Sequence, residues 1–578
     1  MDNLTNTWPV AKVIEQLTDW LTVHFSGLFN LLQTVGQKVM DTITGILGLV
    51  PIPVWIVLLT VIAYIITNKK KGLPIFTFLG LVFIANQGLW DALLQTTTLV
   101  LVASVISIVI GVPLGIWMAK SETVRKVLTP ILDFMQSMPS FVYLIPAVAF
   151  FGIGMVPGVF ASVIFALPPT VRFTHLGIKQ IPTELVEASD SFGGTAWQKL
   201  LKLELPLAKK TILAGVNQTT MLALSMVVTA SMIGAPGLGR NVLAALQKAD
   251  IGSGFVSGLA LVILAIMIDR FIQYTNREKQ HAHQKMPKKQ KIALTSAVLA
   301  VLAIGAIVQN VVLGTQTKET IRLAYVQWDT EVASTNVIAQ VLEDEGYQVE
   351  MTPLDNAVMW EAVANKRADA MVAAWLPNTH ASQYKKYKDQ LVDLGANLKG
   401  AKVGLVVPSY MKVDAISDLS DEAGKKITGI EPGAGVVAGA KKTIKAYDNL
   451  SDWQVETSSS GAMVVALDKA IKNKEDIVIT GWSPHWMFAK YDLKYLKDDK
   501  KSMGSAEEIH TMTSKDFAKE HQKANQILDN FHWSTKDMES VMLDIQNGKE
   551  PKQAAKDWIK ANPEKVKAWV NMGKDNLH

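Results

Sequence analysis

The run DALLQTTTLVLVASVISIVIGVPLGIWM occupies residues 91–118, and after Asp91 it contains no charged side chain. An α-helix rises 1.5 Å per residue, so about 20 apolar residues cross the hydrocarbon core of a bilayer. Seven other apolar runs approach or exceed that length, at residues 51–67, 73–90, 130–151, 156–176, 211–233, 252–273 and 292–313. The sequence therefore predicts a membrane protein with eight helical spans.

The composition changes after about residue 313, where the long apolar runs stop and charged residues become frequent. A chain of 578 residues is too long for one hydrophobic core, so we expect separate domains. The expected parts are an N-terminal amphipathic segment at 1–50, a transmembrane domain at 51–273, a basic cytoplasmic loop with an anchoring transmembrane helix at 274–317, and a soluble domain at 318–578. The N-terminal segment has the apolar spacing of a helix, which fits an interfacial helix and a soluble one about equally well.

Basic residues gather in four short loops of the membrane half, at residues 69–71, 120–126, 199–210 and 277–291. Cytoplasmic loops carry an excess of Lys and Arg. Alternating the spans places all four clusters in the cytoplasm and puts the N-terminus and the C-terminal domain outside the cell. The net charge of +5 is small and lies largely in these loops, which argues against a nucleic-acid-binding protein. The absence of cysteine excludes disulfides and thiol catalysis.

Residues 184–206 lie between the fifth and sixth predicted spans and contain the sequences VEASDSFG at 186–193 and LELP at 203–206. This segment resembles the coupling loop of ABC importer permeases, in which Glu-Ala-Ala is followed by three residues, Gly, nine residues, an aliphatic residue, one residue and Leu-Pro. The matching positions are Glu187, Ala188, Gly193, Leu203, Leu205 and Pro206, and Ser189 replaces the second alanine. Glycine permits a turn with positive φ, and proline suits the first turn of the following helix. The resemblance implies a helix–turn–helix that docks in a groove of a cytosolic ATPase, whereas an ordinary amphipathic loop is the alternative.

The chain carries no nucleotide-binding motif of its own. A Walker A motif needs Gly, four residues, Gly-Lys and Ser or Thr to hold phosphates. The nearest segment, 433–443, has no glycine directly before a Lys-Ser/Thr pair. We therefore expect ATP and magnesium to be bound by two copies of a separate ATPase subunit, beside a homodimer of this chain. The chain itself is expected to be a transport subunit without a cofactor, because no Ser-His-Asp order, carboxylate pair or metal-ligand spacing indicates a catalytic or metal site.

The soluble part alternates between strand-like and helical runs, with predicted strands at 320–326, 348–351, 370–374, 403–407, 427–430 and 477–480. This alternation predicts a two-lobed α/β fold with a ligand cleft at the carboxyl ends of the strands. Trp328, Trp375 and Trp482 each follow a predicted strand. An indole face attracts a methylated ammonium ion through cation–π interaction, worth about 0.5–2 kcal/mol for each ring. The sequence therefore predicts an aromatic cage for a small quaternary ammonium compound.

A second set of groups in the same domain suits an anion. Residues 433–438 read GAGVVA and open a predicted helix directly after a strand. The backbone N–H groups of Gly435 and Val436 would meet a carboxylate there, supported by the helix dipole. His485 lies one turn beyond Trp482 and would donate a hydrogen bond to the same carboxylate. A ligand with a quaternary ammonium at one end and a carboxylate at the other would satisfy both sets.

The soluble domain is similar to the glycine betaine/proline-betaine binding proteins of osmoprotectant importers. The sequence Gly-Trp-Ser-Pro-His-Trp at 481–486 is the most specific part of this resemblance, which extends over nearly the whole chain. It implies a multi-span α-helical membrane permease of the ABC type I importer kind, fused to a two-lobed α/β periplasmic-type substrate-binding domain and located in the cell membrane. The ligand residues that it implies are Trp328, Trp375, Trp482, His485, Gly435 and Val436.

The leading hypothesis from the sequence is ATP-driven uptake of glycine betaine for osmoprotection. An importer of carnitine or choline is one alternative, and choline differs in having no carboxylate. A membrane receptor that binds the same solute and signals without transporting it is another. The coupling-loop pattern at 184–206 favours an importer over a receptor.

Overall fold

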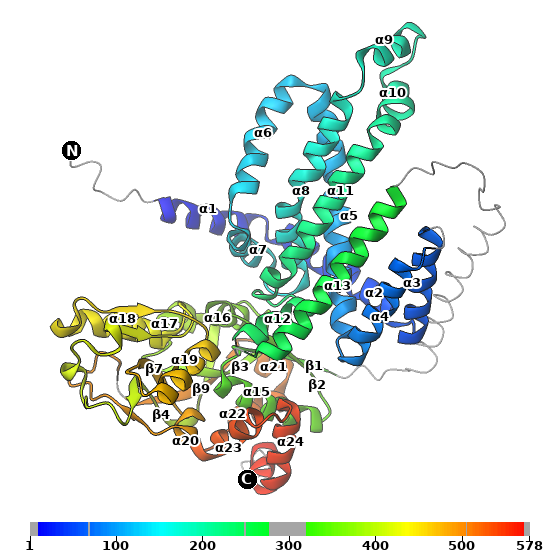
Figure 1. The fold of residues 1–578 in the computed structure, drawn as a ribbon. Coiled ribbons are helices and arrows are strands. Elements are labelled where there is room, and N and C mark those ends of the chain that lie inside the picture. Colours follow the sequence, from blue (N-terminus) through cyan, green and yellow to red (C-terminus); the bar gives the residue numbers. More distant parts are fainter. Residues whose placement is uncertain (1–9, 68–69, 248–249, 277–318, 505, 572–578) are drawn as a thin grey trace, which may run out of the picture. The chain divides into compact units, whose positions relative to one another are not determined.

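The computed structural model describes residues 10–67, 70–247, 250–276, 319–504 and 506–571. The chain forms two compact units (Figure 1). One is helical and includes nearly all of α13 (Ile251–Asn276), and the other is a mixed α/β unit that contains the strands from β1 (Thr320–Tyr325) onward and the end of α12 (Leu238–Gln247). The predicted anchoring helix at 292–313 and most of the basic loop before it lie outside the described residues. The domain boundaries drawn from the sequence therefore stay predictions.

The helical unit consists of α-helices joined by short breaks. Its remaining elements are α1 (Val10–His24), α2 (Ser26–Gly48), α3 (Ile52–Ile66), α4 (Gly72–Asn86), α5 (Trp90–Lys120), α6 (Glu122–Ser137), η2 (Ser140–Tyr143), α7 (Leu144–Phe151), α8 (Met155–Lys179), α9 (Thr183–Ser191), α10 (Ala196–Lys199), η3 (Leu200–Glu204), α11 (Leu205–Ser231) and α12 (Leu238–Gln247). Four stretches are long and apolar enough to cross a membrane unbroken: α5, α8, the continuous run from α10 to α11, and α13. Two further pairs of helices are each sharply bent at a short break. If each pair counts as one span, the described residues contain up to six spans.

The bent pairs differ from the straight spans that the sequence predicts. The predicted span 130–151 is broken, because α6 and the following η2–α7 segment meet at 106°. Met138 has extended backbone, as the residue before a proline prefers, and Pro139 has no N–H to continue the helix. The predicted span 51–67 is the second arm of another bent pair, at 89° to α2. The predicted span 73–90 corresponds to α4, which has only 15 residues.

Helix α8 is packed tightly between α5 and α11 through glycines. A Cβ atom on Gly115 of α5 would lie 2.5 Å from Thr174 Cβ, so only glycine permits this approach. On the other side, Thr219 of α11 lies 2.7 Å from the Thr170 hydroxyl and donates to the carbonyl oxygen of Ala166 at 2.8 Å. These buried polar contacts satisfy side chains that would be costly to leave unpaired in a membrane.

Within its described residues, the α/β unit contains nine strands, with helices packed around the sheet. The strands after β1 are β2 (Gln348–Pro353), β3 (Ala370–Leu376), β4 (Leu391–Pro408), β5 (Lys426–Thr428), β6 (Gln454–Glu456), β7 (Val478–Ser483), β8 (Leu493–Tyr495) and β9 (Glu507–Ser514). The main helices are α15 (Asp329–Asp344), α16 (Asn356–Ala364), α17 (Ala381–Tyr387), α18 (Gly435–Ala446), α19 (Ser460–Asn473), α20 (Met487–Lys490), α21 (Phe517–Glu520), α22 (Gln522–Asn530), α23 (Thr535–Gln546), α24 (Pro551–Ala561) and α25 (Pro563–Asn571). Each of the six strands predicted from the sequence overlaps an observed strand.

The sheet order β2-β1-β3-β9-β4-β7-β5-β6, with β8 beside β4, divides the unit into two lobes. The long strand β4 belongs to both, because residues up to Ala401 pair with β9 and residues from Lys402 pair with β7. The first lobe thus holds β1, β2, β3 and β9, and the second holds β5, β6, β7 and β8. In each lobe the parallel strands end at one edge, where ligands bind in open α/β folds.

Candidate functional site

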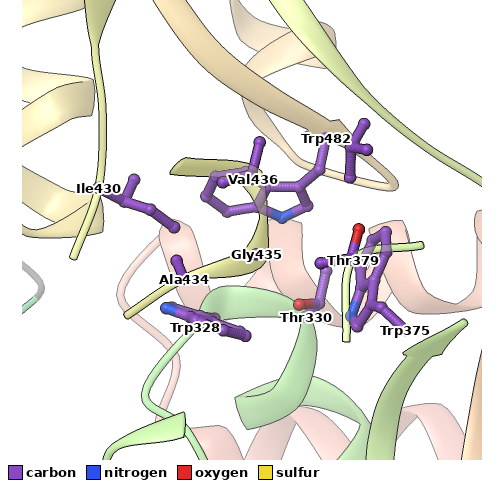
Figure 2. A pocket seen from close by; sticks show the side chains of 10 residues that line it. Trp328, Thr330, Trp375, Thr379, Ile430, Ala434, Gly435, Val436 and Trp482 are labelled. Carbon is purple, nitrogen blue, oxygen red and sulfur yellow. The ribbon is translucent and has the colours of Figure 1, made fainter. Parts of the chain in front are cut away.

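The three tryptophans predicted to form a cage line one pocket at these strand ends. The pocket is lined by Trp328, Thr330, Trp375, Thr379, Val403, Ile430, Ala434, Gly435, Val436 and Trp482. Figure 2 shows Trp328 and Trp482 on opposite sides of the space and Trp375 along a third side. All three side chains are more than nine-tenths buried, so their ring faces are shielded from bulk water. The atom-free space is about 320 Å³, part of it open to solvent.

The strands place the indoles slightly differently from the sequence prediction. Trp328 follows β1 and stands at the N-terminus of α15, as predicted. Trp375 and Trp482 lie within the last two residues of β3 and β7 instead of beyond the strand ends. The pairing of these strands with β9 and β4 fixes both rings in the sheet. The cage is therefore built mostly on rigid backbone.

Several contacts join the two lobes across the pocket. The Trp328 indole N–H donates to Glu431 Oε2 at 3.2 Å, and the Trp486 indole N–H donates to Asp329 Oδ2 at 2.8 Å. A Cβ atom on Gly435 would lie only 2.0 Å from the carbonyl oxygen of Thr379. The first lobe supplies one partner of each contact and the second lobe supplies the other. The structure thus shows the cleft with its lobes closed on each other.

Glu431 holds the Trp328 ring in place from the second lobe. Its Oε1 accepts the Ser460 N–H at 3.2 Å while Oε2 accepts the indole N–H of Trp328. Burial raises the pKa of the Glu431 carboxyl, and these hydrogen bonds oppose that shift. The Trp328 ring is thereby fixed at its edge, which leaves its face free to contact a ligand.

Gly435 and Val436 stand at the start of α18 and both line the pocket. The first hydrogen bonds into this helix come from Val437 and Ala438, which donate to the carbonyl oxygen of Ala434 at 3.1 and 3.2 Å. Among the described residues, the N–H groups of Gly435 and Val436 have no acceptor. Two free backbone donors at the positive end of a helix form a site for an anion.

His485 is fully buried behind Trp482 and is not among the residues that line the pocket. Its ring meets the Trp482 ring edge-on, with centroids 4.8 Å apart. Its Nδ1 accepts the Met487 N–H at 3.1 Å, so the proton of the neutral ring is on Nε2. Nε2 lies 3.4 Å from Asp329 Oδ2 but does not form a hydrogen bond with it. Burial lowers the pKa of His485 to about 4, so the ring is a neutral donor at pH 7.

A second buried histidine, which was not predicted from the sequence, repeats this arrangement in the first lobe. His380 Nδ1 accepts the Trp375 N–H at 3.1 Å, and its Nε2 has no partner among the described residues. Burial lowers the pKa of His380 to about 3. Its ring lies 6.1 Å from Trp328 and 5.7 Å from Trp360, centroid to centroid. The two sequences Trp-Leu-Pro at 375–377 and Trp-Ser-Pro at 482–484 are the signal from which this repeat could have been found.

The other missed residues of the cleft are Thr330, Thr379, Val403, Ile430 and Ala434, which line the pocket. Most of them follow or end strands, but their residue types are too common to be distinguished in the sequence. The structure brings together five of the six predicted ligand residues as pocket lining and leaves the sixth, His485, directly behind one of them. The roles assigned to these residues stay predictions.

The coupling segment lies at one end of the helical unit, beyond α8 and α11 (Figure 1). Glu187 and Ala188 lie in α9, and Gly193 makes the turn after it with a φ of +72°. Leu205 begins α11 and Pro206 stands in its first turn. The predicted helix–turn–helix is therefore present in the structure.

Ion pairs stiffen the coupling segment while its apolar side chains stay exposed. Lys199 bonds Asp190 across the turn at 2.8 Å, and Lys120 at the end of α5 bonds the buried Glu204 at 2.5 Å. Phe192 is 92% exposed and Trp197 is 68% exposed. Large apolar side chains held out on a stiff segment suit contact with another protein.

Comparison with known proteins matches both halves of the chain. Residues 319–561 match the family described as the substrate binding domain of ABC-type glycine betaine transport system. Residues 111–280 match the family of binding-protein-dependent transport system inner membrane components. The chain is 56% identical over 274 residues to the glycine betaine/carnitine transport permease protein GbuB of Listeria monocytogenes, which covers 47% of this chain and 97% of that protein. The chain belongs to the glycine betaine family of ABC importers.

Two further relatives match one half of this importer subunit each. The glycine betaine transport system permease protein OpuAB of Bacillus subtilis is 50% identical over 281 residues, which cover 48% of this chain and 98% of that protein. The crystal structure of lactococcal OpuAC, closed and complexed with glycine betaine, is 58% identical and covers 44% of this chain and 100% of that chain, with a TM-score of 0.44. The importer subunit thus carries a membrane permease and a substrate-binding domain in one polypeptide, as the sequence predicts.

Proposed function

We propose that this chain is the permease and substrate-binding subunit of an ATP-driven importer that takes up glycine betaine. The observation that carries the proposal is the closed cleft in which three indoles stand beside the free N–H groups of Gly435 and Val436. A trimethylammonium group has no N–H to donate, so it binds best against aromatic faces. The carboxylate of the same molecule would accept hydrogen bonds from the start of α18.

His485 supports this assignment through its protonation state. Its Nε2 carries the proton and has no acceptor, although the ring is buried. A buried donor without a partner costs free energy, and an arriving carboxylate would supply the missing acceptor. No Lys or Arg side chain lines the pocket. Neutral donors would hold the carboxylate without a cationic side chain that repels the ammonium end.

The proposal extends to partners that transport requires. ATP and magnesium would be bound by a separate cytosolic ATPase in two copies, which docks on the coupling segment at 184–206. Two copies of this chain would form the membrane pathway as a homodimer. The basic loops would face the cytoplasm, which places the substrate-binding domain outside the cell. The exposed Phe192 and Trp197 support the docking of a partner at the coupling segment.

Calorimetric titration of the purified full chain tests the cargo assignment. We expect betaine to bind with a Kd in about the micromolar range, as three desolvated cation–π contacts and a bound carboxylate would allow. Choline should bind more weakly because it lacks the carboxylate, and carnitine and proline betaine complete the panel. No heat with any of these compounds would overturn the proposal. Uptake into proteoliposomes that contain the ATPase then separates an importer from a receptor that only binds.

A further inference from the structure

A second cavity lies in the helical unit and is lined by residues of α6, α8 and α11. These three helices are labelled in Figure 1. The cavity has about 920 Å³ of atom-free space, part of it open to the surroundings. Its lining includes Gln136 of α6, Phe165, Pro169, Arg172 and Phe173 of α8, and Gln218 of α11. Two aromatic rings, a guanidinium and two carboxamides thus meet at one place.

The packing of α8 fixes which of its faces points into this cavity. Residues 165, 169, 172 and 173 follow the spacing of one helical face. A Cβ atom on Gly111 of α5 would lie 2.8 Å from the Thr170 side chain, so a different face of α8 is held against α5. A Cβ atom on Gly215 of α11 would lie 2.6 Å from Phe173 Cβ. Glycine at 215 therefore lets α11 press against Phe173 and set its position.

The polar side chains at this cavity are costly in a bilayer. Helices α8 and α11 belong to stretches that are long and apolar enough to cross a membrane unbroken. Arg172 forms an ion pair with Asp133 of α6, yet its side chain remains 38% exposed. Gln136 and Gln218 make no hydrogen bond within the described residues. Charged and amide groups on helices of this kind face water, protein or a polar solute and not lipid tails.

Pro169 adds a polar atom to the cavity wall. A proline within a helix has no N–H for the carbonyl four residues before it. The carbonyl oxygen of Phe165 therefore lacks its usual donor inside α8, which continues through Pro168 and Pro169. A carbonyl oxygen without that donor keeps its partial negative charge available in this part of α8, which also carries the two phenyl rings. That combination suits the methyl groups of a quaternary ammonium ion, which carry part of its positive charge.

We propose that this cavity is a second, weaker binding site for the transported zwitterion on its way through the membrane. Arg172 and the amides of Gln136 and Gln218 would hold the carboxylate, and Phe165 and Phe173 would face the quaternary ammonium. The guanidinium has five N–H donors, so its pairing with Asp133 leaves donors for a ligand. This inference rests on the proposed function, because the cargo is taken from it.

The site should bind the solute weakly and release it quickly. Phe attracts cations less strongly than Trp, and only two rings are present here. Arg172 is already neutralised by Asp133, so a carboxylate gains less from it than from an unpaired cation. The cavity also has nearly three times the atom-free space of the cleft. A zwitterion would therefore be held loosely and released quickly.

The test uses the full chain assembled with its ATPase in proteoliposomes, with betaine as the probe. We expect Arg172→Gln and Phe173→Leu each to lower the maximal rate of uptake at least about tenfold. The KM of uptake and the Kd of the cleft should stay within about twofold, because the cleft captures the solute. Arg125→Gln and Phe134→Leu on α6 are matched controls, since Arg125 has an exposed ion pair with Glu122 and Phe134 is exposed away from the cavity lining. Both controls should keep wild-type rates.

A purely structural role of the ion pair is tested by exchanging its charges. The double variant Asp133→Arg with Arg172→Asp keeps an ion pair but moves the cation from α8 to α6. We expect uptake to stay low in this variant if Arg172 meets the solute. Recovered uptake would overturn the proposal, because it would show that the pair only holds α6 to α8. Arg172→Lys keeps a cation at the site, and we expect it to recover more uptake than Arg172→Gln.

The inference and the proposed function fail in different measurements. If the wild-type cleft binds no betaine, the proposed function fails whatever the cavity variants do. If the cleft binds betaine and both Arg172→Gln and Phe173→Leu import it at wild-type rates, only the cavity site is overturned. Phe173→Leu keeps the test decisive even if loss of the Arg172–Asp133 pair prevents assembly.

Discussion

The cleft of the α/β unit and the cavity of the helical unit both combine aromatic faces with hydrogen-bond donors. They differ in the kind of ring, in the charge of the donors and in the space that these groups enclose. The cleft has three buried indoles, neutral donors and about 320 Å³ of space. The cavity has two phenyl rings, a charged guanidinium and about 920 Å³. Burial and close fit make an interaction strong, whereas an open, already neutralised site makes it weak. From this difference we propose that the cleft selects the solute and that the membrane unit lets it pass.

The two regions also differ in how their side chains are fixed. In the cleft, strand pairing holds Trp375 and Trp482, and Glu431 holds the Trp328 ring from the other lobe. In the cavity, glycines at helix contacts set the position of α8, and the polar side chains extend into open space. Changes in the cleft should therefore alter affinity, and changes in the membrane unit should alter rate.

The largest effect is expected at the centre of the cage. Trp482→Ala removes a buried ring that forms one wall of the cleft. We expect betaine affinity to fall by about 2–4 kcal/mol, or about 30- to 1,000-fold, because cation–π attraction and water exclusion are lost together. Trp482→Phe should fall between this variant and the wild type. Calorimetric titration measures the loss. Unchanged affinity of Trp482→Ala would show that the indole cage is not what binds the solute strongly.

A single added methyl group should prevent the cleft from closing. In Gly435→Ala the new Cβ would lie 2.0 Å from the Thr379 carbonyl oxygen, so the lobes must stay apart. We expect a loss of affinity of about 1–3 kcal/mol, or roughly 5- to 150-fold. Gly433→Ala is the matched control, because its Cβ would meet nothing closer than Asp355 Oδ1 at 3.9 Å. Equal affinities of the two variants would show that closure does not depend on this contact.

A substitution in the coupling segment should have a different effect, a loss of transport without a loss of binding. Gly193 turns the chain after α9 with a φ of +72°, which a β-branched residue rarely adopts. We expect Gly193→Val to lower uptake about tenfold while the Kd for betaine stays unchanged, because the turn no longer holds α9 against the ATPase. Gly193→Asn should recover part of the rate, since Asn tolerates this conformation. A parallel loss of binding would contradict the division between the two regions.

The sequence predicted the cleft better than the membrane unit. Each of the three cage tryptophans lies within three residues of a strand end, a position that the pattern of strands reveals. Strand β9 was missed, because its sequence EEIHTMTS has little apolar alternation and its pairing with β3 and β4 is set by residues far away in the chain. The long strand β4 was predicted only in its second half for the same reason.

In the membrane unit, hydropathy gave the four unbroken spans but not the bends. Pro139 marks the break after α6, yet the 106° angle depends on how α7 packs against its neighbours. The cavity was not predicted, because Asp133 and Arg172 are 39 residues apart and meet only through helix packing. The burial of His485 was likewise invisible, since a histidine near a strand end is equally compatible with exposure.

A smaller effect is expected at the histidine behind the cage. His485→Ala removes the unpartnered Nε2 donor and leaves the three indoles in place. We expect betaine affinity to fall about tenfold, as for loss of one hydrogen bond to a charged group, while choline affinity changes little. Titration of both compounds into the variant measures the contrast. An equal loss for betaine and choline would assign His485 a role in positioning Trp482 instead of contacting a carboxylate.

The least local effect concerns pH and the stability of the whole α/β unit instead of ligand affinity. Burial lowers the pKa of His485 to about 4, whereas an unfolded histidine titrates near 6.5. Between these values the unfolded chain takes up a proton that the folded domain excludes, so the free energy of unfolding falls as pH drops from 6.5 to 4. Titration of His485 lowers the free energy of unfolding by about 3 kcal/mol over this pH range and does not change it at higher pH. Urea unfolding of residues 319–578 at pH 7.5, 5.5 and 4 measures it, with His485→Gln as the variant that cannot titrate. The variant should lose about 3 kcal/mol less than the wild type on acidification, and equal losses would mean that the ring is hydrated and lies open to the cleft.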